Sequence, residues 1–141
     1  MAEHLAVRPV EGTDIPEVLR LWETSRSITA SIPDQPDFVR QLIEHTEDAL
    51  LVAELDGRIV GALVAAWDGW RGNMYRLAVH RGHRRVGIAR QLVRAGEERL
   101  RARGALRVTA LVPREDEAAA SLWSAAGYER DPYVERFVKN L

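Results

Sequence analysis

The sequence has 141 residues, of which 46% are hydrophobic, and a formal net charge of -1 at pH 7. These values are typical of one soluble globular domain, and the near-neutral charge argues against a protein whose main task is to coat nucleic acid. The absence of cysteine excludes disulfide frameworks, thiolate nucleophiles and cysteine-ligated zinc.

The N-terminal part of the sequence predicts one strand and two amphipathic helices. Residues 6–10 are typical of a short strand, and Thr13 or Asp14 can cap the helix that follows. Residues 23–35 lose the helical periodicity and run into IPDQP, which predicts an exposed loop. The apolar positions at helical spacing are Ile15, Val18, Leu19 and Trp22 in the first helix, and Phe38, Val39, Leu42 and Ile43 in the second.

The middle of the sequence predicts three antiparallel strands. Residues 49–55 and 58–67 are β-rich runs separated by Asp56-Gly57, which is a strong signal for a two-residue hairpin turn. A second turn over residues 68–72 leads into another β-rich run over residues 74–79. We therefore expect a meander of neighbouring strands in this part of the chain.

The last third predicts two more helices and further strands. A long amphipathic helix covers residues 87–103, with Gly104 as its C-terminal stop. Residues 107–112 predict a strand, residues 116–126 a short helix, and residues 134–138 a last strand. The expected order is βααβββαβαββ, an α/β (α+β) arrangement. No repeat or linker divides it, so we expect a single domain over residues 1–141.

A basic loop before the long helix carries the clearest functional signal. The segment VHRGHRRVGIA, which starts at Val79, is a strand end that opens directly into the helix. The first N–H groups of a helix lack intrahelical acceptors and carry partial positive charge, so they form an anion site. Gly87 and the small Ala89 let a ligand approach this backbone closely. The full charges around the site come from Arg84, Arg85 and Arg90.

The same segment resembles a known motif. Arg84-x-x-Gly87-x-Ala89 is similar to the Arg/Gln-x-x-Gly-x-Gly/Ala pyrophosphate motif of the GNAT superfamily of acetyl-CoA-dependent N-acetyltransferases. The segment SLWSAAGY from Ser121 resembles the family's later Leu-Tyr-x-x-x-Gly-Phe segment, and the order of elements matches the GNAT fold across nearly the whole chain. The stretch from Ala65 to Leu92 is also similar to small bacterial members of the YpeA type.

This resemblance implies a mixed, splayed central sheet of about seven strands flanked by about four helices. Strand 74–79 would part from strand 107–112, and the pantetheine of acetyl-CoA would lie between them. The pyrophosphate would bind the N–H groups of residues 85–90, and the N–H of Val79 would hold the developing oxyanion of the thioester. The cofactor-binding residues that the resemblance implies are Leu77, Ala78, Val79, Arg84, Arg85, Val86, Gly87, Ile88, Ala89, Arg90, Asp116 and Trp123.

Three positions depart from the family pattern. Asp116 stands where the family often has a cofactor-contacting Asn, and Asp is also a good helix N-cap. Trp123 stands where the family's frequent general acid, a Tyr, would be, but an indole N–H is not a usable acid and the position also fits a core or wall residue. Leu111 stands where some members carry a general-base Glu. The remaining candidates for a base are Asp68, Glu115, Glu117 and Glu23.

Other polar and aromatic side chains have both a functional and a structural interpretation. The candidates for binding the acetyl acceptor are Trp22, Glu23, Trp67 and Tyr75. On the hairpin, Trp67 and Tyr75 equally fit cross-strand packing. His80 and His83 have no third donor nearby in sequence, so we expect no metal site. The arginines expected on the solvated face of the long helix are Arg94, Arg99, Arg101 and Arg103.

The function expected from these residues is transfer of the acetyl group of acetyl-CoA to a primary amine. Direct attack in a ternary complex is expected, because the chain has no cysteine and no G-x-S-x-G elbow. The favoured acceptor is a small amine or amino-acid derivative, and a protein N-terminus or lysine is the alternative. A non-catalytic acyl-CoA-binding module is an alternative of another class, suggested by the missing Tyr and Glu.

The expected partners are acetyl-CoA and an amine acceptor, without nucleic acid or a membrane; a homodimer stays open. No stretch approaches the roughly 18 apolar residues of a membrane span. The N-terminal residues lack the basic-then-apolar pattern of a signal peptide. We therefore expect a cytoplasmic location.

Overall fold

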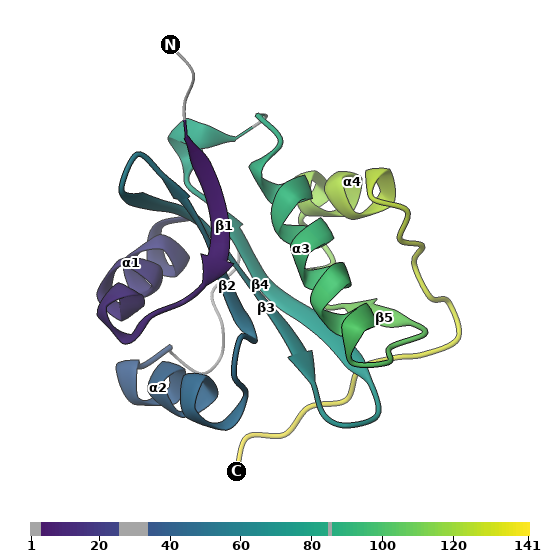
Figure 1. The fold of residues 1–141 in the computed structure, drawn as a ribbon. Coiled ribbons are helices and arrows are strands. Elements are labelled where there is room, and N and C mark those ends of the chain that lie inside the picture. Colours follow the sequence, from purple (N-terminus) through teal and green to yellow (C-terminus); the bar gives the residue numbers. More distant parts are fainter. Residues whose placement is uncertain (1–3, 26–33, 85) are drawn as a thin grey trace.

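The computed structural model describes residues 4–25, 34–84 and 86–141, which form one sheet with helices on both of its faces (Figure 1). In chain order the elements are β1 (Leu5–Pro9), α1 (Ile15–Ser25), α2 (Pro36–His45), β2 (Leu50–Leu55), β3 (Arg58–Trp67), β4 (Gly72–Val79), α3 (Ile88–Ala102), β5 (Val108–Ala110) and α4 (Glu117–Ala125). Short 3-10 turns precede α1 (Gly12–Asp14) and follow β4 (Arg81–His83).

The sheet has the strand order β1-β2-β3-β4-β5. The three strands of the expected meander, β2, β3 and β4, pair antiparallel in chain order. Strand β1 adds antiparallel to β2, whereas β5 runs parallel to β4. The turn between β2 and β3 is made by Asp56 and Gly57, which adopt φ of 50° and 83°. Positive φ at both positions is what a type I′ hairpin turn requires, so the predicted hairpin is confirmed.

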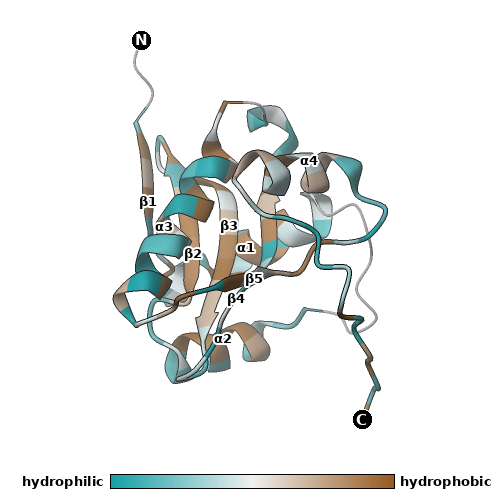
Figure 2. Cartoon of the chain, turned by 90° about the vertical axis from the view of Figure 1, so that its right-hand side faces the viewer, coloured by the Kyte–Doolittle hydropathy of each residue, from teal (hydrophilic) through white to brown (hydrophobic). Residues whose placement is uncertain are grey.

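Both faces of the sheet are covered. Helices α1 and α2 lie on one face and α3 and α4 on the other (Figure 1). Figure 2 shows the consequence for β2 and β3, which are largely hydrophobic because both of their faces are covered. Leu63 and Met74 are fully buried in the cluster beneath α3, and Val18 and Val64 are at most 1% exposed in the cluster beneath α1. None of the described helices is long and apolar enough to cross a bilayer.

Glycines let α3 lie very close to the sheet. A Cβ on Gly96 would come 2.8 Å from the Cε of Met74 and 3.3 Å from the Cβ of Ala65. A Cβ on Gly61 of β3 would come 2.9 Å from the Cδ1 of Leu92. Larger residues at these positions would crowd these side chains, so the two glycines let α3 pack closely on the sheet, with its N-terminal turns against β3.

The end of the chain differs from the prediction. Seven strands were expected, but the described residues form five, and the order βααβββαβαββ is wrong at its last two strands. Residues 134–138 form no strand, and Tyr133 and Phe137 are 92% and 90% exposed. A strand needs a paired backbone and alternating apolar positions, whereas the apolar residues here come as adjacent pairs.

Candidate functional site

Strand β4 contains a β-bulge in the middle of the sheet. The pairing register shifts between Ala62 and Val64, so one residue of β3 faces two residues of β4. At the bulge Arg76 adopts φ of 59°, a left-handed conformation that non-glycine residues rarely take. Bulges bend a strand and change the direction of the groups that follow, so this bulge sets the orientation of residues 77–79.

The N–H group of Val79 points away from β3. The N–H of His80 donates to the carbonyl of Val60 at 2.7 Å, which makes Val79 and Gly61 a non-hydrogen-bonded pair of the antiparallel ladder. Both backbone polar groups of Val79 therefore face the side where β5 lies. In the described ladder, however, β5 pairs only with the first three residues of β4, Gly72–Met74. The two parallel strands thus part before they reach Val79.

The loop after β4 ends in a helix start suited to an anion. Gly87 is the N-cap of α3 and adopts φ of 85° and ψ of 6° without a side-chain cap. The N–H of Gln91 donates to the Gly87 carbonyl as the first intrahelical bond, so the N–H groups of residues 88–90 point out of the helix end. Ile88 is buried and fixes this turn, while Val86 and Arg90 are exposed beside it. Arg85 lies outside the described residues.

The side chain of Arg84 joins two elements. Its Nε donates to the carbonyl of Val79 at 3.2 Å, and its Nη2 donates to the carbonyl of Ser25 at 2.9 Å. Ser25 is the last residue of α1, where the helix dipole places partial negative charge. The guanidinium of Arg84 therefore ties the end of β4 to the end of α1.

The predicted acceptor residues are divided between the two faces of the sheet. Trp22 is 3% exposed, and its indole N–H donates to the carbonyl of Arg76 at 3.0 Å. Tyr75 packs against the same apolar cluster, where burial raises the pKa of its hydroxyl. Trp67 packs against the opposite cluster, beneath α3, and Glu23 is exposed on α1. The structure therefore brings Trp22 and Tyr75 together but not Trp67.

The predicted bases also lie at different ends of β4. The carboxylate of Asp68 accepts hydrogen bonds from the N–H groups of Trp70 and Arg71, at 2.8 and 2.6 Å, and these bonds lower its pKa. The turn that contains Asp68 precedes Gly72, the first residue of β4. At about 3.3 Å per residue, the start of β4 lies roughly 23 Å along the strand from Val79. Glu115 is exposed in the turn after β5, at the end of the parallel pair where Val79 lies.

The start of α4 is capped as the sequence suggested. The carboxylate of Asp116 accepts a hydrogen bond from the N–H of Ala119 at 2.9 Å. Trp123, on the same helix, is only 5% exposed and packs edge to face on Tyr128, with ring centroids 4.9 Å apart. Its place in the cluster beneath α3 makes it a core residue.

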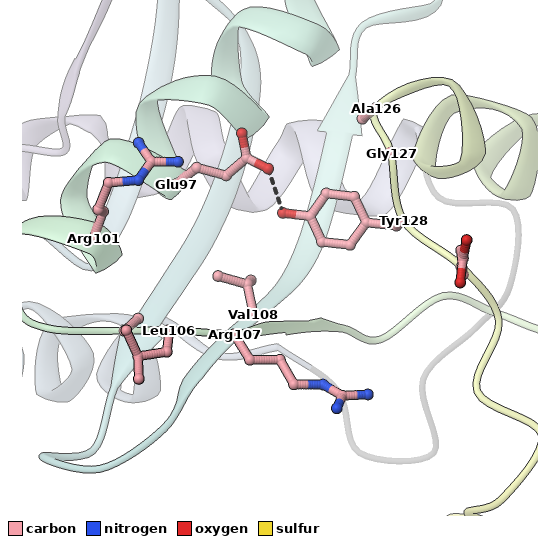
Figure 3. Close-up of a pocket in the computed structure, with 10 residues that line it drawn as sticks. Glu97, Arg101, Leu106, Arg107, Val108, Ala126, Gly127 and Tyr128 are labelled. Carbon is pink, nitrogen blue, oxygen red and sulfur yellow. Dashed lines mark hydrogen bonds between the residues drawn. The ribbon is translucent and has the colours of Figure 1, made fainter.

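A cavity of about 410 Å³ lies beside this helix (Figure 3). The hydroxyl of Tyr128 points toward α3 and donates to Glu97 at 2.7 Å. Burial and this carboxylate raise the pKa of Tyr128. Glu97 is nine residues after Ile88, so at 1.5 Å per residue the cavity lies about 13 Å along α3 from the helix start. It is therefore separate from the anion site.

The two histidines of the loop contact each other. Their Nδ1 atoms are 3.4 Å apart, and the Nδ1 of His80 also lies 3.1 Å from the N–H of Gly82, which donates to it. Over the described residues no three His, Asp or Glu side chains gather in a way that would hold a metal ion.

Two arginines, Arg76 and Arg84, organise this region, and only Arg84 was a candidate from the sequence. Arg76 was not a candidate, because nothing local marks a non-glycine residue as left-handed. Arg84 was expected to face the ligand, whereas two of its donors bind backbone carbonyls. Their partners Ser25 and Asp34 are distant in sequence, so only the motif position of Arg84 was a signal.

A family profile and a related protein sequence both match this chain to acetyltransferases. Residues 15–128 match the profile of the acetyltransferase (GNAT) family. An acetyltransferase of Photorhabdus laumondii is 34% identical over 125 residues, which cover 89% of this chain and 87% of that protein.

Two solved structures share the fold. An aminoglycoside N-acetyltransferase in complex with CoA has a TM-score of 0.78 at 18% identity, over 100% of this chain and 98% of that one. The diaminobutyrate acetyltransferase of Paenibacillus lautus, in complex with its substrate and coenzyme A, has a TM-score of 0.73 at 22% identity, over 88% and 75% of the two chains.

Proposed function

Because this chain belongs to the GNAT family of acetyltransferases, we propose that it acetylates the primary amine of a small molecule or amino-acid derivative. The chain is an acetyl-CoA-dependent N-acetyltransferase, and acetyl-CoA is its co-substrate. The placement of acetyl-CoA and the oxyanion role of Val79 are supported by the direction of the Val79 N–H, which faces the parted strands at the end nearest the start of α3.

We place acetyl-CoA along the edge of β4 that β5 leaves uncovered. Pantetheine contains amides, so it can pair with the backbone of residues 77–79 as a strand would. The pyrophosphate then reaches the N–H groups at the start of α3, where Gly87 leaves the backbone open and Arg90 adds positive charge. Arg85, Asp116 and Trp123 stay predictions as cofactor contacts.

The reaction proposed for this site is a direct attack. The neutral amine adds to the thioester carbonyl carbon, and the N–H of Val79 stabilises the oxyanion that forms. The C–S bond then breaks and the thiolate of CoA leaves; with a pKa near ~8.5, taking cysteine as the model, it departs without an enzyme acid. The proton lost by the amine goes to a base, directly or through water, and Glu115 is better placed for this than Asp68.

Two features favour a small cationic acceptor. On the α1 and α2 side of β4, the carboxylate of Glu23 is exposed on α1 and can attract a cation. The structurally similar enzymes named above act on aminoglycosides and on diaminobutyrate, which are small amines. A peptide N-terminus or a lysine side chain is the competing acceptor.

A panel assay of CoA thiol release tests this function. Purified protein is incubated with acetyl-CoA and, separately, with polyamines, amino sugars, diamino acids and peptides with free N-termini or lysines. Turnover with a small amine well above that with every peptide supports the proposal, and the reverse ranking contradicts it.

Intact-mass analysis after incubation with acetyl-CoA alone should show no stoichiometric acetyl adduct, because attack is direct.

A further inference from the structure

Two arginines hold the two ends of the connection between α1 and α2. Ser25, the last residue of α1, is 7% exposed, and its carbonyl accepts from Nη2 of Arg84 at 2.9 Å. Asp34, close to the start of α2, forms an ion pair with Nη2 of Arg76 at 2.7 Å. The side chains of that pair are 25% and 19% exposed, so the pair is screened from water more than a surface salt bridge is.

Both arginines also contact the part of β4 that carries the oxyanion donor. The Nε of Arg84 donates to the carbonyl of Val79. Arg76 forms the bulge that precedes residues 77–79, and its own carbonyl accepts from the indole of Trp22, a residue of α1. Each arginine therefore touches both the α1–α2 side and the strand where the thioester would lie.

The identity of residue 76 indicates that its side chain is used. A φ of 59° favours Gly, Asn or Asp, and an arginine there is strained by an energy of order 1 kcal/mol. A bulge alone would be made at lower cost by glycine. The ion pair with Asp34 accounts for the presence of a long, charged side chain at this place.

Given the acetyltransferase function proposed above, we propose that Arg76 and Arg84 are positioning residues that align the bound acceptor with acetyl-CoA. They fix Ser25 and Asp34, and with them the α1 and α2 side of β4, where we place the acceptor, against the segment of β4 that binds the thioester. Neither guanidinium needs to touch the reacting atoms. Loss of either should therefore weaken the use of the acceptor more than the binding of acetyl-CoA.

Arg76 gives the sharper kinetic test. Arg76→Gln and Asp34→Asn should each raise the KM of the best small amine by about tenfold, because each breaks a charge-assisted pair. The double variant should be less impaired than the two single losses combined, since both changes remove the contact that the two side chains share. Arg76→Lys keeps the charge and should recover most of the loss. In all of these variants the Kd for acetyl-CoA, measured by calorimetry, should change by less than about threefold, which is well below one tenfold step in affinity.

Matched controls separate positioning from general charge loss. Arg90→Gln, at the start of α3, should have the opposite pattern: it should raise the Kd for acetyl-CoA with little change in the KM of the acceptor. Arg94→Gln, exposed on the next turn, should change neither value. Melting temperatures of all variants show whether any effect arises from loss of the fold. An acetyl-CoA Kd that rises as much as the acceptor KM in Arg76→Gln would overturn the assignment.

A second measurement does not depend on turnover. Amide hydrogen exchange, followed by mass spectrometry on peptides that contain Ser25 or Asp34, should be faster in Arg84→Gln and Arg76→Gln than in wild type and Arg94→Gln. Unchanged exchange would refute the positioning role. If no amine in the panel is acetylated but hydrogen exchange responds as expected, the proposed acceptor class is wrong. The contacts of Arg84 with Ser25 and of Arg76 with Asp34 would still be supported.

Discussion

At the scale of single residues, the conformation of Gly87 links the loop to the binding of acetyl-CoA. With φ of 85° at the N-cap of α3, this glycine turns the following N–H groups out of the helix end. A Cβ at this position would meet no atom within 4 Å, but a valine cannot adopt this backbone without strain. We expect Gly87→Val to raise the Kd for acetyl-CoA at least about tenfold, which corresponds to 1.4 kcal/mol.

Two variants control for the backbone itself. Gly57 has the same conformation, with φ of 83°, in a hairpin turn that is also open. Gly57→Val should therefore cost similar stability with little change in acetyl-CoA affinity, as measured by calorimetry. Gly87→Asn should bind better than Gly87→Val, since Asn tolerates the left-handed region. Equal affinity of Gly87→Val and wild type would place the pyrophosphate elsewhere.

Trp123 is a residue where family analogy and environment disagree. It is buried against Tyr128, and an indole cannot deliver a proton to the departing thiolate. We expect Trp123→Phe to lose about 1–3 kcal/mol of stability by leaving a cavity, while kcat stays within about tenfold. The pH profile should rise with deprotonation of the amine and show no falling limb from an enzyme acid. A fall in kcat above about 100-fold at unchanged acetyl-CoA affinity would give the indole a catalytic role.

At the scale of elements, the entry into α1 depends on one carboxylate. Asp14 pairs with Arg8 of β1 at 2.8 Å and accepts from the N–H of Glu11 at 2.8 Å, and the Arg8 bond is the main cause that lowers its pKa from 3.8. Since the folded pKa lies below the unfolded one, its stabilisation is complete above about pH 4 and disappears as pH falls through the folded value.

Asp14→Asn should therefore lower the free energy of unfolding by about 1 kcal/mol at pH 7. The difference from wild type should shrink as pH falls below about 4, which urea titrations at a series of pH values would measure. The control is Asp37→Asn, whose pair with Arg40 is exposed on α2 and should contribute little. A difference that persists unchanged at low pH would mean that the carboxylate's charge is not what stabilises the turn.

The elements predictable from sequence are those encoded by local pattern. The turn at Asp56-Gly57, the long helix with its glycine stop and the N-cap at Asp116 all follow from short-range rules, and the structure has them within one or two residues. Residues 134–138 were predicted wrongly as a strand, because the segment has no partner edge in the sheet. Pairing is a property of the sheet, and local sequence does not contain it.

Of the candidate acetyl-CoA site, the part formed by the loop after β4 and the start of α3 was predictable from the sequence. The anion site before α3 follows from the glycine and the arginines of one short segment. The bulge at Arg76 depends instead on Trp22 and Asp34, which belong to other elements. Likewise, Arg99 was assigned to a solvated face but donates to the carbonyl of Glu47 at 2.6 Å and is half-buried. Tertiary contacts of this kind decide which arginines face a ligand.

At the scale of the whole molecule, the last ten residues stand apart from both cores. Tyr133, Phe137 and Leu141 are almost fully exposed, and neither core cluster includes them. Removing residues 132–141 should therefore change the free energy of unfolding by less than about 1 kcal/mol, as expected for exposed residues. Thermal or urea unfolding of the shortened chain measures this. A large loss of stability would show that the segment packs on the protein in solution.

The short pairing between β4 and β5 has a consequence for the protein without its co-substrate. Among the residues that the structure describes, only three pairs join the parallel strands, so the sheet is left incomplete along the rest of that edge. A cofactor that pairs with this edge acts as a removable sixth strand, and its binding energy becomes folding energy by mass action. At a hundred times its Kd, acetyl-CoA would add about 2.7 kcal/mol to the stability of the chain. The lifetime of the folded enzyme would then follow the supply of acetyl-CoA, so that the protein persists where its substrate is abundant.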